Sequence, residues 1–135
     1  MTHKYIAAAQ QPQYETKDSG QRDEFSSGML REPDTGQPRF DVLVPETVPF
    51  DEQLLTRCAA PMEGGAQKYS PRNWEKADSA AELERMKASA FRHVMQWLTG
   101  ETDEDHAAAV VFNLLAVETT AYRIEQGVKN GELGF

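Results

Sequence analysis

Apolar residues recur at helical spacing along the second half of the chain, and they outline its helices. One set predicts a helix that begins near Asp51. Its members are Leu54, Leu55, Cys58, Ala59 and Met62. Pro61 should end or kink this helix near Ala60, because proline lacks the backbone N–H that a helix interior needs. The glycine pair at 64–65 weakens the turns that follow, and the Tyr-Ser-Pro sequence at 69–71 should stop them.

A second helix is predicted behind a capping signal. Ser79 and Glu82, three residues apart, have the spacing of a capping box, in which two side chains bond the first backbone N–H groups of a helix. The apolar positions behind them share one helical face: Leu83, Met86, Ala90, Val94 and Trp97. Gly100 should end this helix, because glycine readily adopts the left-handed conformation found after a helix.

The next stretch predicts a third, central helix that begins at Thr102 or Asp103 and runs to about Gln126. Every residue from 107 to 117 is apolar except Asn113. A helix that is apolar on all sides is normally buried, so we expect this one to form the central wall of the domain. Acidic residues in its first turn would suit the positive end of the helix dipole.

The first part of the chain lacks such a pattern. Residues 10–28 contain one tyrosine and one phenylalanine as their only large apolar groups, a composition too polar to offset the entropy of ordering. We therefore expect residues 1–28 to form a flexible arm. The prolines between residues 29 and 45 are incompatible with a helix, and residues 40–44 predict an extended segment or a lone strand.

Together these elements predict an all-α protein, a small helical bundle over residues 29–135 with an extended N-terminal segment. At 135 residues the chain has room for one domain with its own core. Three helices make a thin bundle whose remaining apolar faces a second copy would cover. We therefore expect a homodimer or a larger homo-oligomer.

Charge and composition exclude several classes of partner. The formal net charge is −8 and the isoelectric point about 4.8, which argues against a nucleic-acid polymer or an anionic membrane. Cys58 is the only cysteine, so an internal disulfide is excluded and a reducing cytoplasm is the natural setting. The start does not resemble a signal peptide, and no run approaches the roughly 18 apolar residues that cross a bilayer. We expect a soluble cytoplasmic protein.

The acidic cluster before the central helix is the strongest chemical candidate. It consists of Glu101, Asp103, Glu104 and Asp105. Glu101 can share a helical face with either Glu104 or Asp105, which are three and four residues further on. Mg²⁺ prefers oxygen ligands and usually takes one or two carboxylates together with substrate phosphates. The alternative is an acidic turn that only caps the helix and keeps it soluble.

Two histidines and an asparagine lie on the apolar faces of the last two predicted helices. His93 belongs to the stripe of its helix, and its neighbour Arg92 would be costly to bury without an anion. His106 and Asn113 are seven residues apart and hence on one helical face. A histidine, an asparagine and an arginine that converge from two helices suggest a polar slot within the bundle. Alternatively, His93 is an ordinary core histidine and Asn113 locks the helix register.

A segment in the middle of the chain combines turn glycines, cations and aromatic rings. Lys68 and Arg72 suit phosphate oxygens, and Tyr69 or Trp74 could stack on a nucleobase. Each of these features alone is weak, because surface loops often carry such residues by chance.

Four stretches in this order resemble the dATP/dGTP diphosphohydrolase family, which is common in bacteriophages and related to the MazG-like all-helical nucleotide pyrophosphohydrolases. The first two are G-x-P-R-F-D-x-L-x-P at residues 36–45 and G-A-x-K-Y-x-x-R-N-W-E-K at residues 65–76. The others are S-A-x-R-H at residues 89–93 and G-E-x-x-E-D-H, with a downstream Asn, at residues 100–113.

The resemblance implies Mg²⁺-dependent hydrolysis of dGTP or dATP, with Mn²⁺ as a substitute, to the monophosphate and pyrophosphate. Water attacks the α-phosphorus. The resemblance also makes Asp105 and Glu101 the catalytic candidates. The metal ligands that it implies are Glu63, Glu101, Glu104 and Asp105. The implied substrate contacts are Arg39, Lys68, Arg72, Asn73, Trp74, Arg92, His93, His106 and Asn113.

Two other functions stay open. The E-x-x-E pair of typical MazG-like helices has no counterpart before Trp74, where Glu63 is the only acid between Glu52 and Glu75. A catalytically silent nucleotide-binding or assembly protein would keep the fold without the full metal set. A MazG-type enzyme acting on damaged or pyrimidine nucleotides is the other possibility. In each case we expect a small-molecule nucleotide as the partner, in the host cytoplasm if a bacteriophage encodes the protein.

Overall fold

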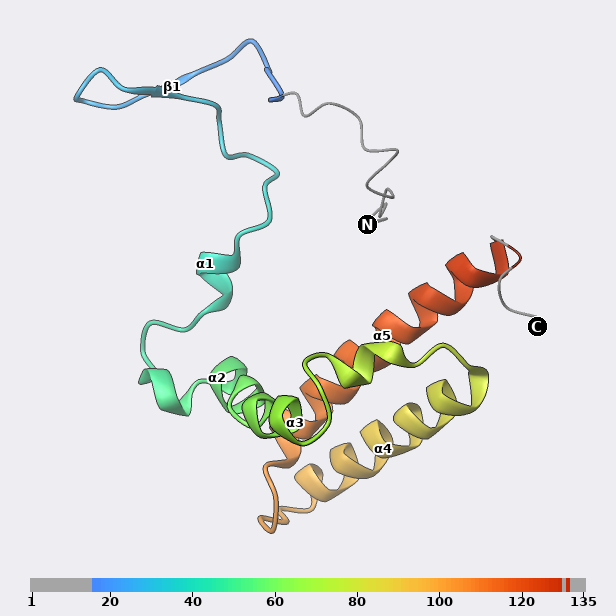
Figure 1. Cartoon of the computed structure of the whole chain (residues 1–135). Coiled ribbons are helices and arrows are strands. Elements are labelled where there is room, and N and C mark those ends of the chain that lie inside the picture. The colour runs from blue at the N-terminus through green and yellow to red at the C-terminus, as the bar shows by residue number, and fades with distance from the viewer. Residues whose placement is uncertain (1–15, 130, 132–135) are drawn as a thin grey trace. The chain divides into compact units, whose positions relative to one another are not determined.

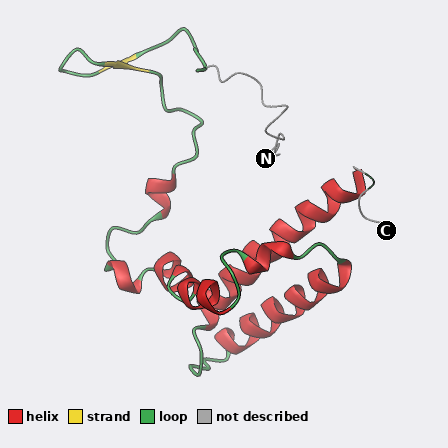
Figure 2. Ribbon diagram, in the orientation of Figure 1, coloured by secondary structure: helices red, strands yellow, loops and turns green. Residues whose placement is uncertain are grey.

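The computed structural model describes residues 16–129 and residue 131, and it is mostly helical (Figures 1 and 2). The chain separates into two compact units, Met1–Arg39 and Phe40–Phe135. The second unit carries every helix of the described chain. The predicted all-α fold class is therefore confirmed.

The described part of the first unit contains a short hairpin. Strand β1 (Asp23–Glu24) pairs antiparallel with β2 (Leu30–Arg31). Gly28 has a φ of +88°, a conformation that glycine adopts without strain, and it closes the turn between the strands. Residues 16–28 of the predicted flexible arm thus include the first hairpin strand, and residues 1–15 lie outside the described part. The flexibility of the arm stays a prediction.

The second unit begins with a helical turn where the sequence predicted an extended segment. Helix α1 (Phe40–Leu43) lies between Pro38 and Pro45, so neither ring interrupts its backbone. A proline disfavours helical geometry in the residue before it, and α1 accordingly ends before Val44. The expectation of a strand here was wrong, because the prolines bound this helical turn instead of lying inside it.

The predicted break at Pro61 is confirmed. A 3₁₀ turn, η2 (Phe50–Glu52), precedes α2 (Leu54–Ala59), and α3 (Met62–Lys68) follows Pro61. A second 3₁₀ turn, η3 (Asn73–Lys76), leads toward the next long helix.

Helix α4 (Ala80–Leu98) has the predicted ends. Ser79 Oγ accepts a hydrogen bond of 3.2 Å from the backbone N–H of Glu82, as a capping box requires. Gly100, with a φ of +80°, turns the chain after the helix. Helix α5 (His106–Lys129) then returns antiparallel along α4 (Figure 1).

The core of this unit lies where α5 packs against α4, α2 and η3. Its buried apolar residues are small: Cys58, Ala77, Ala108, Ala116 and Val117. Trp74 of η3 meets Phe112 of α5 edge to face, with ring centroids 6.0 Å apart. Arg123 of α5 donates to the backbone carbonyls of Glu75 and Ala77 and so ties η3 to the long helix.

Two expectations about the central helix were wrong. It begins at His106, so the acidic residues precede it instead of forming its first turn. It is also not buried on all sides, since Leu114 and Leu115 each expose 51% of their surface. Among the described residues of this unit, the side of α5 that carries Leu114 and Leu115 is exposed.

Within the described residues, α5 is the one helix long and apolar enough to cross a membrane by length and composition. The core helix of a soluble bundle passes the same test, and α5 packs against α4 and α2. It also buries the polar residues His106, Asn113 and Thr120. The absence of a membrane partner stays a prediction.

Candidate functional site

The loop between α4 and α5, residues 99–105, carries the acidic cluster and is called the acidic loop below. Its first carboxylate is fixed to the end of α4. The backbone N–H of Glu101 donates to the carbonyl of Gln96 at 3.0 Å, and Gln96 Nε2 donates to Glu101 Oε2 at 2.9 Å. Gln96 Oε1 is buried and has no hydrogen-bond partner within the described part of the chain.

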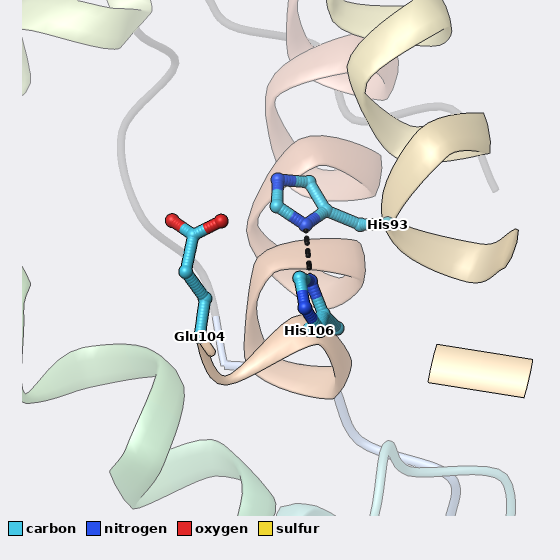
Figure 3. Close-up of side chains that lie close together, drawn as sticks. All are labelled: His93, Glu104 and His106. Carbon is cyan, nitrogen blue, oxygen red and sulfur yellow. Dashed lines mark hydrogen bonds between the residues drawn. The ribbon is translucent and has the colours of Figure 1, made fainter. Parts of the chain in front are cut away.

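The two histidines face one another next to this loop (Figure 3). His93 Nδ1 of α4 lies 2.9 Å from His106 Nδ1 of α5. The two residues expose only 7% and 2% of their surfaces. His106 Nε2 lies 2.7 Å from Asp103 Oδ1, and this hydrogen bond lowers the pKa of the Asp103 carboxyl. The predicted burial of His93 is confirmed, and its partner is a second histidine.

These contacts bring metal-binding groups together. Ligand atoms of His93, Glu104 and His106 lie within 4.8 Å of one another, and so do those of Glu101, Asp103 and His106. His106 belongs to both groups, because its two ring nitrogens point to different partners. Imidazole nitrogens and carboxylate oxygens at such separations suit a divalent cation.

Asp105 is placed differently from its acidic neighbours. Arg57 of α2 holds both of its oxygens, with Nε donating to Oδ2 at 2.9 Å and Nη2 donating to Oδ1 at 3.0 Å. The backbone N–H of Ala108 also donates to Oδ1, at 3.1 Å, which makes Asp105 the N-cap of α5. The Arg57 hydrogen bonds are the main reason that the pKa of Asp105 is lowered. Asp105 therefore joins α2 to the start of α5.

Sequence reasoning missed Arg57. It lies 48 residues before Asp105 and follows no motif that points to a carboxylate. Its position beside the buried Cys58, on the helix facing α5, is the one local signal that it has a partner.

The predicted polar slot is only partly assembled. Asn113 is buried and its Nδ2 donates to the carbonyl of Ala109 in its own helix, at 2.8 Å. Arg92 is exposed, with Nη2 3.5 Å from Ser89 Oγ on the same helix. The concern that Arg92 needs a buried anion therefore does not arise, because α4 turns its side chain away from the core.

Residues 68–76, called the cationic segment below, present exposed charges beside a packed ring. Lys68 Nζ lies 5.1 Å from the centroid of the Tyr69 ring. Arg72 has a left-handed backbone with a φ of 57°, and its Nε is 3.8 Å from Glu75 Oε2. Asn73 is exposed at the start of η3, whereas Trp74 is half-buried against α5.

The resemblance implies site roles for two further residues, Glu63 and Arg39. Glu63 is exposed on α3 and belongs to neither group of metal-binding atoms. Arg39 belongs to the first unit, where its Nη1 is 3.8 Å from Asp34 Oδ2. For both, the role implied by the resemblance stays a prediction.

Comparison with protein-family models yields a match. The family model described as dATP/dGTP diphosphohydrolase, N-terminal, matches residues 27–129. No curated protein and no solved structure matches the chain. The matched range includes the cationic segment, both histidines and the acidic loop, and the family is named for a diphosphohydrolase of purine deoxynucleoside triphosphates. The chain belongs to the dATP/dGTP diphosphohydrolase N-terminal family.

Proposed function

We propose that the protein hydrolyses dGTP or dATP to the monophosphate and pyrophosphate, with water attacking the α-phosphorus. The observation that carries this proposal is the convergence of Glu101, Asp103 and Glu104 with His93 and His106 at the acidic loop. It occurs in a chain whose family is named for this reaction.

The side chains at this loop fit a divalent cation, Mg²⁺ or Mn²⁺. Glu101, Asp103 and Glu104 supply carboxylate oxygens, and the buried Gln96 Oε1 is an unused acceptor beside Glu101. When bound, the metal would neutralise charge on the phosphate oxygens and lower the pKa of water. We assign Asp105 to positioning instead, because Arg57 and the start of α5 already hold its two oxygens.

The cationic segment would receive the triphosphate. Lys68 and Arg72 are exposed, and a guanidinium and an ammonium match phosphate oxygens in charge and hydrogen bonding. Asn73 adds an exposed amide next to Arg72. Trp74 supports this segment through its contact with Phe112, so we assign it to the wall of the site.

A second copy of the chain would complete the bundle. Phe91, Met95 and Leu98 follow each other at helical spacing on α4 and are exposed. Leu114 and Leu115 are exposed on α5. Burying such side chains is favourable by about 25 cal/mol per Å² of apolar surface, which supports the expected homodimer or larger oligomer. We place the protein in the cytoplasm, where free deoxynucleotides are found.

One assay tests the proposed reaction. Pure protein is incubated with each of the four deoxynucleoside triphosphates and Mg²⁺, and pyrophosphate and monophosphate are quantified. We expect equimolar products from dGTP or dATP. Release of inorganic phosphate without pyrophosphate would reject attack at the α-phosphorus. A nucleotide-induced rise in melting temperature without any product would favour the silent binding protein.

A further inference from the structure

We propose that His93 is a nitrogen ligand of the metal centre, held for this task by a hydrogen-bonded chain from Asp103 through His106. The atom offered to the metal is His93 Nε2, and the neighbouring ligand is the Glu104 carboxylate. The site would then take a first-row transition-metal ion such as Mn²⁺ or Co²⁺ in preference to Mg²⁺. This inference rests on the proposed function for the presence of a metal ion at the acidic loop.

The geometry of the two rings indicates a hydrogen bond between them. The Nδ1 atoms are 2.9 Å apart and the ring centroids 5.2 Å apart. The centroid separation is close to the nitrogen–nitrogen distance plus the two ring radii, so the nitrogens point almost directly at each other. A metal ion cannot fit between two nitrogens at this distance. One Nδ1 therefore carries a proton and donates a hydrogen bond to the other.

Asp103 decides which ring is the donor. A carboxylate only accepts hydrogen bonds, so His106 Nε2, 2.7 Å from Asp103 Oδ1, must carry a proton. In the neutral His106 ring the Nδ1 atom is then an acceptor. In this protonation state His93 Nδ1 is the donor, and the lone pair of His93 Nε2 is free to bind a metal. In the same state Asp103 fixes the tautomers of both rings.

The free nitrogen has a suitable neighbour. Figure 3 shows the Glu104 carboxylate beside the His93 ring, on the side of the nitrogen not bonded to His106. Ligand atoms of His93, Glu104 and His106 lie within 4.8 Å of one another. In proteins, a metal-binding histidine usually donates its other ring N–H to an acceptor that fixes its orientation. Here His106 plays that part for His93.

A site with an imidazole ligand prefers different metal ions from a site made of carboxylates alone. Mg²⁺ is bound mainly through oxygen, whereas imidazole suits the later first-row metals. The divalent series rises in affinity from Mn²⁺ through Fe²⁺ to Co²⁺ at such mixed sites. His93 would therefore determine which metal the protein selects.

Nuclear magnetic resonance of tag-free protein labelled with ¹⁵N-histidine shows the tautomers of the rings directly. The chain has three histidines, so His3 serves as an internal reference. We expect the proton on Nε2 of His106 and on Nδ1 of His93, and we expect Co²⁺ to shift the Nε2 resonance of His93 most strongly. A proton on His93 Nε2 in the metal-free protein, or an unshifted His93 ring at saturating Co²⁺, would overturn the proposal.

One variant removes the proposed metal ligand but can keep the hydrogen bond to His106. His93→Asn places an amide near the position of Nδ1, so the contact to His106 can persist while Nε2 is lost. We expect Co²⁺ and Mn²⁺ affinity to fall about tenfold or more, with Mg²⁺ affinity nearly unchanged. His3→Asn is the matched control and should bind all three metals like the wild type. Unchanged Co²⁺ affinity in folded His93→Asn would reject the inference.

These measurements need no nucleotide, so they are independent of the proposed reaction. A protein that binds Co²⁺ through His93 but cleaves no nucleotide would reject the proposed function alone. A protein that cleaves dGTP or dATP but whose metal affinities are unaffected by His93→Asn would reject the inference alone.

Discussion

The acidic loop and the cationic segment are built in different ways. In the acidic loop, side chains are held by partners on the flanking helices: Gln96 holds Glu101, and His106 holds Asp103. In the cationic segment, Lys68 and Arg72 are exposed, and within the described part of the chain they contact Tyr69 and Glu75, which are close in sequence. We therefore expect the acidic loop to be preorganised for a ligand and the cationic segment to be ordered by the ligand. Substitutions in the two regions should change different kinetic constants.

The largest effect on activity is expected from a substitution in the acidic loop. Glu104→Gln keeps the shape of the side chain but removes its charge, so kcat for dGTP or dATP should fall about a hundredfold, with little change in the helical circular dichroism. Glu118→Gln, at an exposed position of α5, is the matched control and should retain wild-type kcat. A Glu104→Gln enzyme with normal kcat would remove the acidic loop from the chemistry.

The next effect is expected in the cationic segment. Lys68→Ala or Arg72→Ala should raise KM for the triphosphate about tenfold, corresponding to about 1.4 kcal/mol, while kcat changes less. The reason is that exposed cations contribute to binding the phosphates in the ground state and the transition state alike. Lys87→Ala, which removes an exposed lysine of α4, should leave KM unchanged. If both variants keep the wild-type KM, the contrast between the two regions fails.

Substitutions of Asp105 test our assignment of this residue to a structural role. Asp105→Ala removes the N-cap of α5 and should lower the free energy of unfolding by about 1 kcal/mol. Asp105→Asn keeps a capping oxygen and should cost less. Chemical denaturation measures both. A loss of kcat by Asp105→Asn as large as that of Glu104→Gln, without loss of stability, would return Asp105 to the metal ligands.

The contribution of Asp105 to the stability of the folded protein also depends on pH. Arg57 lowers the pKa of this carboxyl below its ordinary value of 3.8 in the folded protein, so the folded state binds the proton less readily than the unfolded state. The stabilisation is complete above about pH 4 and is lost as the pH falls through the lowered folded pKa. The stability difference between wild type and Asp105→Asn should therefore vanish at low pH.

The smallest effect on the apo protein is expected at Asn113. Its Nδ2 bonds the Ala109 carbonyl of its own helix, a bond that adds little to α5. Asn113→Ala should leave the apo melting temperature nearly constant. Because the resemblance implies that this amide contacts the substrate, the variant should also reduce the stabilisation given by dGTP with Mg²⁺. A large drop in the apo melt with an undiminished nucleotide shift would make Asn113 a structural residue.

Much of the helical framework could be predicted from the sequence. The capping box at Ser79, the break at Pro61 and the end of α4 before Gly100 all lie where the pattern placed them. The candidate site could be predicted only as a set of residue types. His93 was expected on a core face and Glu104 in a metal-binding cluster. Nothing in the spacing of the two histidines along the chain, however, indicates that His93 pairs with His106.

What the sequence determined by itself is the set of interactions that act over a few residues. A proline, a left-handed glycine or a capping hydroxyl limits a helix through groups within one turn of it, so local pattern suffices. The tertiary structure decided the rest. Arg57 meets Asp105 across 48 residues, and His93 faces His106, because of how α2 and α4 cross α5. Only that crossing distinguishes Asp105, which bonds Arg57 of α2 and caps α5, from the acidic residues that we propose as metal ligands.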